Sequence, residues 1–245
     1  MESNPKIVVV TTVYNCEDYI ERCLNTIKHQ SYDNFTCYLL NDMSTDNTVD
    51  IIKKCVGDDD RFVLINNSFK RFQAGNYDHV IRDSGLVADE DIIVEVDGDD
   101  SLPDPNVLNR VRDYYADDKT WITYGQFMYA YNQRPGFASP VDFSNLRGSR
   151  FTATHLRTWK AWLWNKINQE DLKVDGQFPE CSSDVFFMMP MLEMAGHEHS
   201  KFVGDINYVY NFDNPIGDSK GHRLELTNKF ATLGRQKPVY ERLNK

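Results

Sequence analysis

Several features of common functional classes are missing from this sequence of 245 residues. No apolar run reaches the ~20 residues that a membrane-spanning helix needs, and the N-terminus carries no basic stretch followed by an apolar segment. The fingerprints Gly-x-Gly-x-x-Gly and Gly-x-x-x-x-Gly-Lys-Ser/Thr are absent, which argues against a dinucleotide fold and a P-loop. We therefore expect a cytoplasmic protein without a transmembrane segment.

Basic residues and paired cysteines are also few. The 27 lysines and arginines against 37 acidic residues give a net charge of −10, which argues against nucleic acid or an anionic membrane as partner. The five cysteines include no Cys-x-x-Cys pair, so we expect reduced thiols and no zinc site. An anionic ligand must then be held by local groups, and nothing in the sequence indicates the oligomeric state.

What the sequence does contain is an alternation of strand-like and helix-like segments. The strand-like runs are apolar and lie at residues 6–12, 35–40, 62–65 and 92–96. Helical spacing follows each run, for example over residues 76–84, and Asn15 and either Ser44 or Thr45 are placed to cap the first two helices. This order predicts an α/β fold in which a mostly parallel central sheet is flanked by helices.

A cluster of carboxylates follows the fourth run, in the sequence Asp97-Gly98-Asp99-Asp100. Like charges repel, so such a cluster persists most easily around a cation, and oxygen-rich sites favour Mg²⁺ or Mn²⁺. The alternative is a solvated acidic turn in which Asp104 caps the next helix. Because ligands bind outside the carboxyl ends of parallel strands, residues 12–15, 42–46 and 97–100 are expected along one crevice.

A nucleotide fits that crevice. Without a phosphate-binding loop, its diphosphate would need the cation, with help from the basic pair Lys70 and Arg71. The alternative for this pair is an ordinary solvated surface.

Three motifs together carry a resemblance to a known family. Residues 8–15 (Val-Val-Val-Thr-Thr-Val-Tyr-Asn), 41–48 (Asn-Asp-Met-Ser-Thr-Asp-Asn-Thr) and 97–104 resemble, in order and spacing, the family-2 glycosyltransferases of the GT-A (Rossmann-like) fold. Residues 155–160 and 191–196 resemble a subgroup found in bacteria and large DNA viruses, and a viral source would place the protein in the host cytoplasm.

The resemblance implies an inverting enzyme that moves a sugar from a nucleoside-diphosphate sugar to an acceptor hydroxyl on a glycan or glycoconjugate. Asn41 and Met43 depart from the usual Asp-Asp-Gly-Ser of the second motif, whereas Asp42, which would face the base, is kept, and uracil is the leading base. The implied donor-site residues are Thr11, Thr12, Tyr14, Asn15, Asp42, Ser44, Arg71, Asn76, Asp97 and Gly98. The implied ligands of a Mn²⁺ or Mg²⁺ ion are Asp99, Asp100 and His222.

The second half of the chain is expected to bind the acceptor. We divide one continuous domain into a donor half at residues 1–104, an acceptor and catalytic half at 105–222, and a helical tail at 223–245. Residues 155–167 are expected to form a helix, on which Trp159 is a candidate platform for a sugar ring; ordinary core packing is the alternative.

Asp184 is the candidate general base. It starts an apolar helix at the position where the resembled family has an acidic residue that deprotonates the acceptor, and Glu180 is the second candidate. The alternative is a carboxylate that only complements the helix dipole.

Two other functions remain open at this point. The first is a haloacid-dehalogenase-like phosphatase with Asp97 as nucleophile, although that motif normally follows the first strand of its domain. The second is a nucleotide-sugar binding module without turnover.

Overall fold

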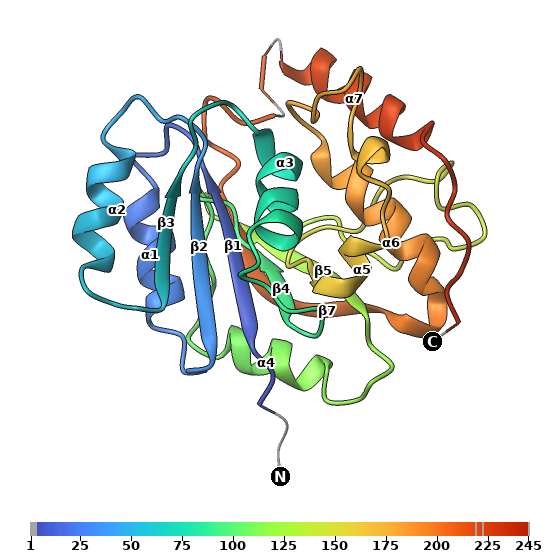
Figure 1. Cartoon of the computed structure of the whole chain (residues 1–245), viewed down its shortest axis with the longest axis horizontal. Coiled ribbons are helices and arrows are strands. Elements are labelled where there is room, and N and C mark those ends of the chain that lie inside the picture. Colours follow the sequence, from blue (N-terminus) through green and yellow to red (C-terminus); the bar gives the residue numbers. More distant parts are fainter. Residues whose placement is uncertain (1–3, 219, 222, 245) are drawn as a thin grey trace.

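The computed structural model describes residues 4–218, 220–221 and 223–244, and Figure 1 shows a twisted sheet with helices packed around it. The sheet has seven strands in the order β3-β2-β1-β4-β6-β5-β7. Neighbouring strands are parallel except where the short β6 pairs with β4 and β5. The predicted α/β fold with a mostly parallel sheet is confirmed.

The strands are β1 (Ile7–Val13), β2 (Phe35–Asn41), β3 (Phe62–Asn66), β4 (Ile92–Glu95), β5 (Ile122–Tyr129), β6 (Thr158–Lys160) and β7 (Ser200–Tyr210). The helices are α1 (Ile20–Lys28), α2 (Thr48–Val56), α3 (Phe72–Asp78), the π-helical η1 (His79–Asp83), α4 (Val107–Tyr114), α5 (Ala161–Asn165), the 3₁₀-helical η2 (Gln169–Leu172), α6 (Ser183–His199) and α7 (Arg223–Arg235).

Two apolar cores lie on the two faces of the sheet. On β1 the side chains of Val8 and Val10 belong to the core beneath α3, α5 and α6, whereas Ile7 and Val9 belong to the core beneath α1 and α4. Successive residues of a strand point to opposite faces, so a sheet covered on both sides needs a continuous apolar run. This is why the runs of the first half could be recognised as strands.

Helix starts in the first half differ from the expected ones. Helix α1 begins at Ile20 rather than after Asn15, and α2 begins at Thr48 rather than at Ser44. The side chains of Asn15 and Ser44 bond to each other's turns instead of capping helices. The helix expected over residues 76–84 begins earlier, at Phe72, and becomes π-helical from His79 onward.

The helix expected over residues 155–167 is wrong. This segment forms the strand β6 and then the short helix α5. Three tryptophans cannot share one helix face; here Trp159 points from the strand into the core, and Trp162 and Trp164 lie on α5. The strand β6 also closes the gap between β4 and β5.

The C-terminal segment is only partly helical. After α7 ends at Arg235, residues 236–244 run back along α6, and the Leu243 N–H donates to the Met194 carbonyl. The loop over residues 134–148 is tied to the same region, because Arg147 forms an ion pair with Glu193 on α6. Within the described ranges, no helix combines the length and apolar character required to span a membrane.

Candidate active site

The loops after β1 and β2 are joined by direct hydrogen bonds. The Asn15 N–H donates to Ser44 Oγ (3.1 Å), and Asn15 Oδ1 accepts from the Thr45 N–H (2.8 Å). Asn15 has a positive φ of 47°, a conformation that asparagine tolerates better than most residues. These contacts fix the first two motifs next to each other at the carboxyl edge of the sheet, as predicted.

Asp42 is the centre of a second set of bonds. Its Oδ1 accepts from Asn67 Nδ2 (2.9 Å) and the Arg71 N–H (2.8 Å), and its Oδ2 accepts from the Phe72 N–H (3.1 Å). The ammonium group of Lys70 lies 3.5 Å from Oδ2. Asp42 is 4% exposed, so the structure shows it holding the loop before α3 in place.

The solvent-facing part of this region is basic and aromatic. Tyr14 is 45% exposed, and the Lys70 ammonium lies over its ring. Burial lowers the pKa of Lys70, whereas the neighbouring Asp42 opposes that shift. The Arg71 guanidinium packs over Phe69 (4.4 Å to the ring centroid), so the basic pair is held by contacts with other side chains.

Two residues expected at the donor site have fully buried side chains. Thr11 is fully buried, with its hydroxyl against Cys37 Sγ at 3.8 Å. Asn76 is also fully buried and accepts from Asn67 Nδ2 (2.7 Å). Both side chains support the site from within the core, because one points to the interior face of β1 and the other lies inside the first turns of α3.

The acidic turn after β4 packs tightly against the end of β1. The Gly98 N–H donates to the Thr12 carbonyl (3.1 Å), and a Cβ at position 98 would lie 2.6 Å from Val13 Cγ1. Glycine is therefore required here by close approach of the backbone. The turn is thereby held beside the first motif.

Two carboxylates of this turn accept hydrogen bonds from the loop after β7. Asp99 Oδ2 accepts from Asn214 Nδ2 (2.7 Å), and Asp100 Oδ1 accepts from the Asn211 N–H (2.6 Å). Asp100 is 1% exposed, and its Oδ2 is buried without a hydrogen-bond partner in the part of the chain that the structure describes. The two side chains thus connect the turn to the loop after β7.

The turn is electrostatically costly. Burial, followed by the charges of Glu95 and Asp99, raises the pKa of Asp97 well above its ordinary value. Burial also raises the pKa of Asp99, and burial together with the charges of Asp99 and Asp97 raises that of Asp100. A cluster of this kind is stabilised by a bound cation or by protons.

A chain of polar contacts that the sequence did not reveal leaves this turn. Gln73 Nε2 donates to Asp97 Oδ1 (2.8 Å) and to Glu95 Oε1 (3.1 Å). The Arg157 guanidinium then joins Glu95 Oε1 (3.0 Å) to Asp184 Oδ2 (2.6 Å). Glu95 interrupts an apolar strand, and a buried charge requires a partner, so Glu95 was the signal for this chain of contacts.

Arg157 is the central member of that chain. It is 4% exposed and is the residue directly before β6. Burial opposes its charge, but the carboxylates of Glu95 and Asp184 raise the pKa of its guanidinium above the ordinary value. Arg157 therefore carries a fixed positive charge between the acidic turn and the candidate base.

Asp184 lies at the start of α6, as predicted. Its Oδ1 accepts from the Val185 N–H (3.0 Å), and its side chain is 22% exposed. Ser182, which precedes the helix, has a positive φ of 51°, and its N–H donates to Asp218 Oδ2 (3.3 Å). The base candidate is thus accessible from solvent and fixed by its neighbours.

The remaining candidate residues of the second half lie in different environments. Trp159 is fully buried and packs against Trp164 (5.8 Å between centroids) and Phe187 (5.6 Å), so the proposed sugar platform is wrong and core packing is correct. Glu180 is exposed, and its carbonyl accepts from Arg223. His222, an expected metal ligand, lies outside the described residues.

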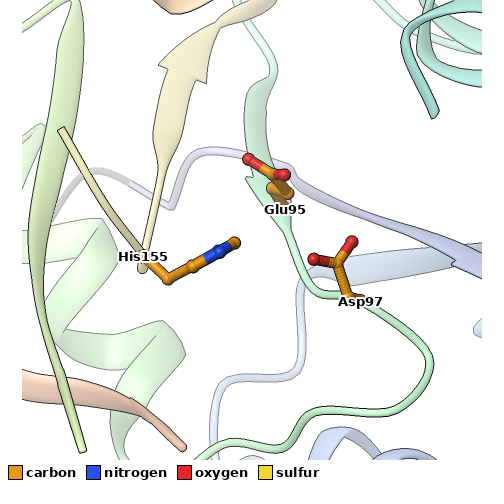
Figure 2. Close-up of side chains that lie close together, drawn as sticks. All are labelled: Glu95, Asp97 and His155. Atoms are coloured by element: carbon orange, nitrogen blue, oxygen red, sulfur yellow. The ribbon is translucent and has the colours of Figure 1, made fainter. Parts of the chain in front are cut away.

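Figure 2 shows a second group with metal-ligating atoms, formed by Glu95, Asp97 and His155. One ligand atom from each lies within 4.8 Å of the others. Burial, followed by the charge of Arg157, lowers the pKa of His155 well below its ordinary value, so its imidazole is neutral. His155 stacks on Tyr208 (4.4 Å between centroids), which fixes the orientation of the ring.

The structure gathers polar side chains of three loops at the carboxyl edge of the sheet. The acidic turn lies beside the first motif, and Arg157 connects Glu95 at the end of β4 to the candidate base Asp184. A model of glycosyl transferase family 2 matches residues 8–163, and the chain belongs to this family. This membership removes the phosphatase alternative, since Asp97 follows the fourth strand of a glycosyltransferase domain.

Several bacterial glycosyltransferases are similar to this chain in sequence. The chain is 30% identical over 134 residues to the glycosyltransferase GlyA of Streptococcus pneumoniae, covering 54% of this chain and 18% of GlyA. It is 26% identical over 121 residues to WfaP of Escherichia coli, a UDP-Glc:alpha-D-GlcNAc-diphosphoundecaprenol beta-1,3-glucosyltransferase, covering 49% of this chain and 45% of WfaP. The chain thus spans less than half the length of these relatives.

Solved structures of similar fold include a mannosyltransferase and a nucleotide-sugar complex. S. aureus TarS 1-349 in complex with UDP-GlcNAc superposes with a TM-score of 0.69 at 16% identity, covering 96% of this chain and 68% of that one. The mannosyltransferase PcManGT of Pyrobaculum calidifontis, in complex with GDP-Man and Mn²⁺, superposes with a TM-score of 0.58 at 20% identity. The match covers 84% of this chain and 56% of that one. These likenesses establish the GT-A fold.

Proposed function

We propose that this chain is an inverting glycosyltransferase that uses a UDP-linked sugar and a divalent cation, with Asp184 as general base. The observation that carries the proposal is the contact chain Asp97–Gln73–Glu95–Arg157–Asp184, which joins the acidic turn to a carboxylate at a helix start. Donor and acceptor would meet along this chain. The names of WfaP and of the TarS complex, both with UDP-sugars, support the choice of donor.

The acceptor side of the reaction rests on Asp184. The acceptor hydroxyl attacks the anomeric carbon as Asp184 takes its proton, and the bond to the diphosphate breaks on the opposite side. A single displacement of this kind inverts the anomeric configuration, and the β-linkage in the name of WfaP supports it. Arg157 holds Oδ2 of Asp184 and thereby fixes the direction in which the carboxylate points.

The leaving-group side rests on the acidic turn. A bound Mn²⁺ or Mg²⁺ would stabilise the negative charge that develops on the departing diphosphate. Asp99 is better placed than Asp100 to hold it, because Asp100 is almost completely buried and accepts from Asn211. Lys70 and Arg71 lie at the loop after β3, where they would meet the nucleotide.

The nucleobase would lie against the loops after β1 and β2. Tyr14 presents an exposed ring there, and Asn15 and Ser44 fix the shape of the pocket. A glycan or glycoconjugate hydroxyl is proposed as acceptor. Asp42 fixes the floor of this pocket through the loop that it binds, and uracil stays the proposed base.

The test has two stages. Thermal unfolding of the purified chain is measured with UDP, GDP, ADP and CMP, each with and without Mn²⁺, because a ligand of the native state raises the melting temperature. We expect UDP with Mn²⁺ to give the largest rise. Turnover of UDP-Glc, UDP-GlcNAc and UDP-Gal is then followed by UDP release with a panel of p-nitrophenyl glycosides, and the product linkage is determined by NMR.

Each outcome has a defined meaning. An α-linked product from an α-linked donor contradicts inversion. Stabilisation by GDP alone would replace the base assignment, and UDP binding without any turnover would favour the nucleotide-sugar binding module.

A further inference from the structure

The group of Glu95, Asp97 and His155 is built into the sheet. Glu95 ends β4, Asp97 begins the following turn, and His155 lies just before β6, which pairs with β4. The Glu95 N–H donates to the Arg157 carbonyl (3.1 Å), so the backbone segments that carry the three side chains are fixed relative to each other. Figure 2 shows the imidazole directed toward the space between the two carboxylates.

Two polar atoms of this group are buried and lack a well-formed hydrogen bond. Glu95 Oε2 and His155 Nδ1 are inaccessible to solvent and, over the residues described, neither makes a hydrogen bond of good geometry, although the Tyr77 hydroxyl is close enough to Glu95 to oppose the rise in its pKa that burial causes. Glu95 itself is fully buried. Buried polar atoms are almost always paired, so unpaired atoms on two residues whose ligand atoms lie within 4.8 Å of each other indicate a missing partner.

The charge around the group also lacks a counterpart. Glu95, Asp97 and Asp184 bring three carboxylates, and Arg157 is the guanidinium that they share. With one guanidinium for three carboxylates, the buried Glu95 and Asp97 are stabilised either by protons, as their raised pKa values indicate, or by a cation. A divalent cation would balance them.

We propose that Glu95, Asp97 and His155 form a divalent-cation site that the chain assembles without nucleotide. Ligand atoms within 4.8 Å of each other fit around one ion. A neutral imidazole with two carboxylates suits Mn²⁺ or another transition metal better than Mg²⁺ or Ca²⁺, which prefer oxygen ligands alone. This site goes beyond the proposed function, in which a cation binds at Asp99 together with the donor diphosphate.

The proposed ion has a structural consequence for the candidate base. It would hold Oε2 of Glu95 while Oε1 stays bonded to Arg157, and Arg157 in turn holds Asp184. The orientation of the base would thus depend on an ion that contacts neither Asp184 nor the acceptor. Ligands of this kind are themselves fixed by neighbouring hydrogen bonds, which Gln73 provides to both carboxylates.

The test uses Mn²⁺ alone, with no nucleotide present. Mn²⁺ binding to the whole chain is followed by electron paramagnetic resonance, and electron spin echo modulation reports whether a nitrogen coordinates the bound ion. We expect a single site with nitrogen coupling. His155→Phe, which keeps a ring over Tyr208, should remove the coupling and weaken binding by at least about tenfold.

Further variants separate this site from others. Glu95→Gln should also weaken nucleotide-free binding by about tenfold or more. His197→Phe, at an exposed histidine, should leave nucleotide-free binding and its nitrogen coupling unchanged.

Either of two results overturns the proposal: no Mn²⁺ bound without nucleotide, or bound Mn²⁺ without nitrogen coupling. Because neither readout involves nucleotide or turnover, failure here leaves the transferase proposal intact, and failure of transfer leaves this site intact.

Discussion

The side-chain carboxylates at the carboxyl ends of β2 and β4 have opposite hydrogen-bonding environments. At the end of β2, Asp42 accepts hydrogen bonds on both oxygens from the protein itself. At the end of β4, Glu95 Oε2 and Asp100 Oδ2 are buried without a partner as far as the structure describes the chain. The first region is complete without a ligand, whereas the second is incomplete because two of its buried carboxylate oxygens accept no hydrogen bond from the residues described.

The largest expected effect is on the rate of transfer and is predicted for Asp184, which Arg157 connects to the incomplete region at the end of β4. Asp184→Asn keeps the shape but removes the proton acceptor, so the rate of transfer should fall by about 10² to 10⁴-fold. UDP affinity should change little, because the nucleotide contacts lie on the β2 side. Transfer rates and UDP titrations check this, with Glu180→Gln as the matched control. Residual transfer above about a hundredth of wild type would move the base elsewhere.

The next largest effect is expected at Arg157. Arg157→Leu leaves Glu95 as an uncompensated buried charge and should lower the free energy of unfolding by about 3–5 kcal/mol. Urea denaturation measures it. The double variant Glu95→Gln/Arg157→Leu should recover part of the loss, since it removes the orphaned charge as well. Equal stabilities of the single and double variants would show that the pair is not coupled.

A smaller effect is expected at the complete region. Asp42→Ala orphans the N–H groups of Arg71 and Phe72 and should cost about 1–3 kcal/mol of unfolding free energy. Uridine affinity should fall with it, even without metal, because the loop shapes the pocket. The control is Asp42→Asn, which keeps one acceptor oxygen. Its unfolding free energy and its uridine affinity should lie between those of wild type and Asp42→Ala. Unaltered uridine affinity in Asp42→Ala would place the base elsewhere.

The smallest effect is expected at Asp46, in the turn after β2. Burial would raise its pKa, but hydrogen bonds from Thr48 and from the Glu17 N–H together lower it below the ordinary 3.8. A lowered carboxyl pKa stabilises the fold above 3.8, and this stability is lost as the pH falls through the lowered value. Asp46→Asn should therefore cost at most about 1 kcal/mol at neutral pH.

Urea denaturation at a series of pH values below neutral checks the Asp46 prediction. The difference between wild type and Asp46→Asn should shrink as the pH falls below 3.8. A difference that grows in acid would mean that the hydrogen bonds favour the protonated form.

The sequence predicts the strands and the order of elements in the first half of the fold because local patterns of adjacent residues indicate them there. It predicts the position of Asp184 for the same reason. Thr11 was expected at the donor site, but its side chain is fully buried. Because residues of both parities on β1 face a core, alternation along the strand gives no signal for this burial.

The remaining errors come from contacts between distant residues. Arg157 and Glu95 are 62 positions apart, and no local pattern announces that they pair. The three residues of β6 are too few for a period to be recognised, so the tryptophans next to it suggested a helix. His155 enters the metal-ligating group only because β6 lies beside β4.

The position of β6 also has a consequence for the order in which the molecule can form. β5 precedes β6 in the chain, but in the described sheet it meets the first four strands only through β6. A growing chain therefore completes the donor half with the edge of β4 still open, and β5 has to wait until residue 160 is available. Arg157 arrives with the same short strand. The acidic turn is thus made before the positive charge that it will be joined to, and the two halves of the site become one only when the last gap in the sheet is filled.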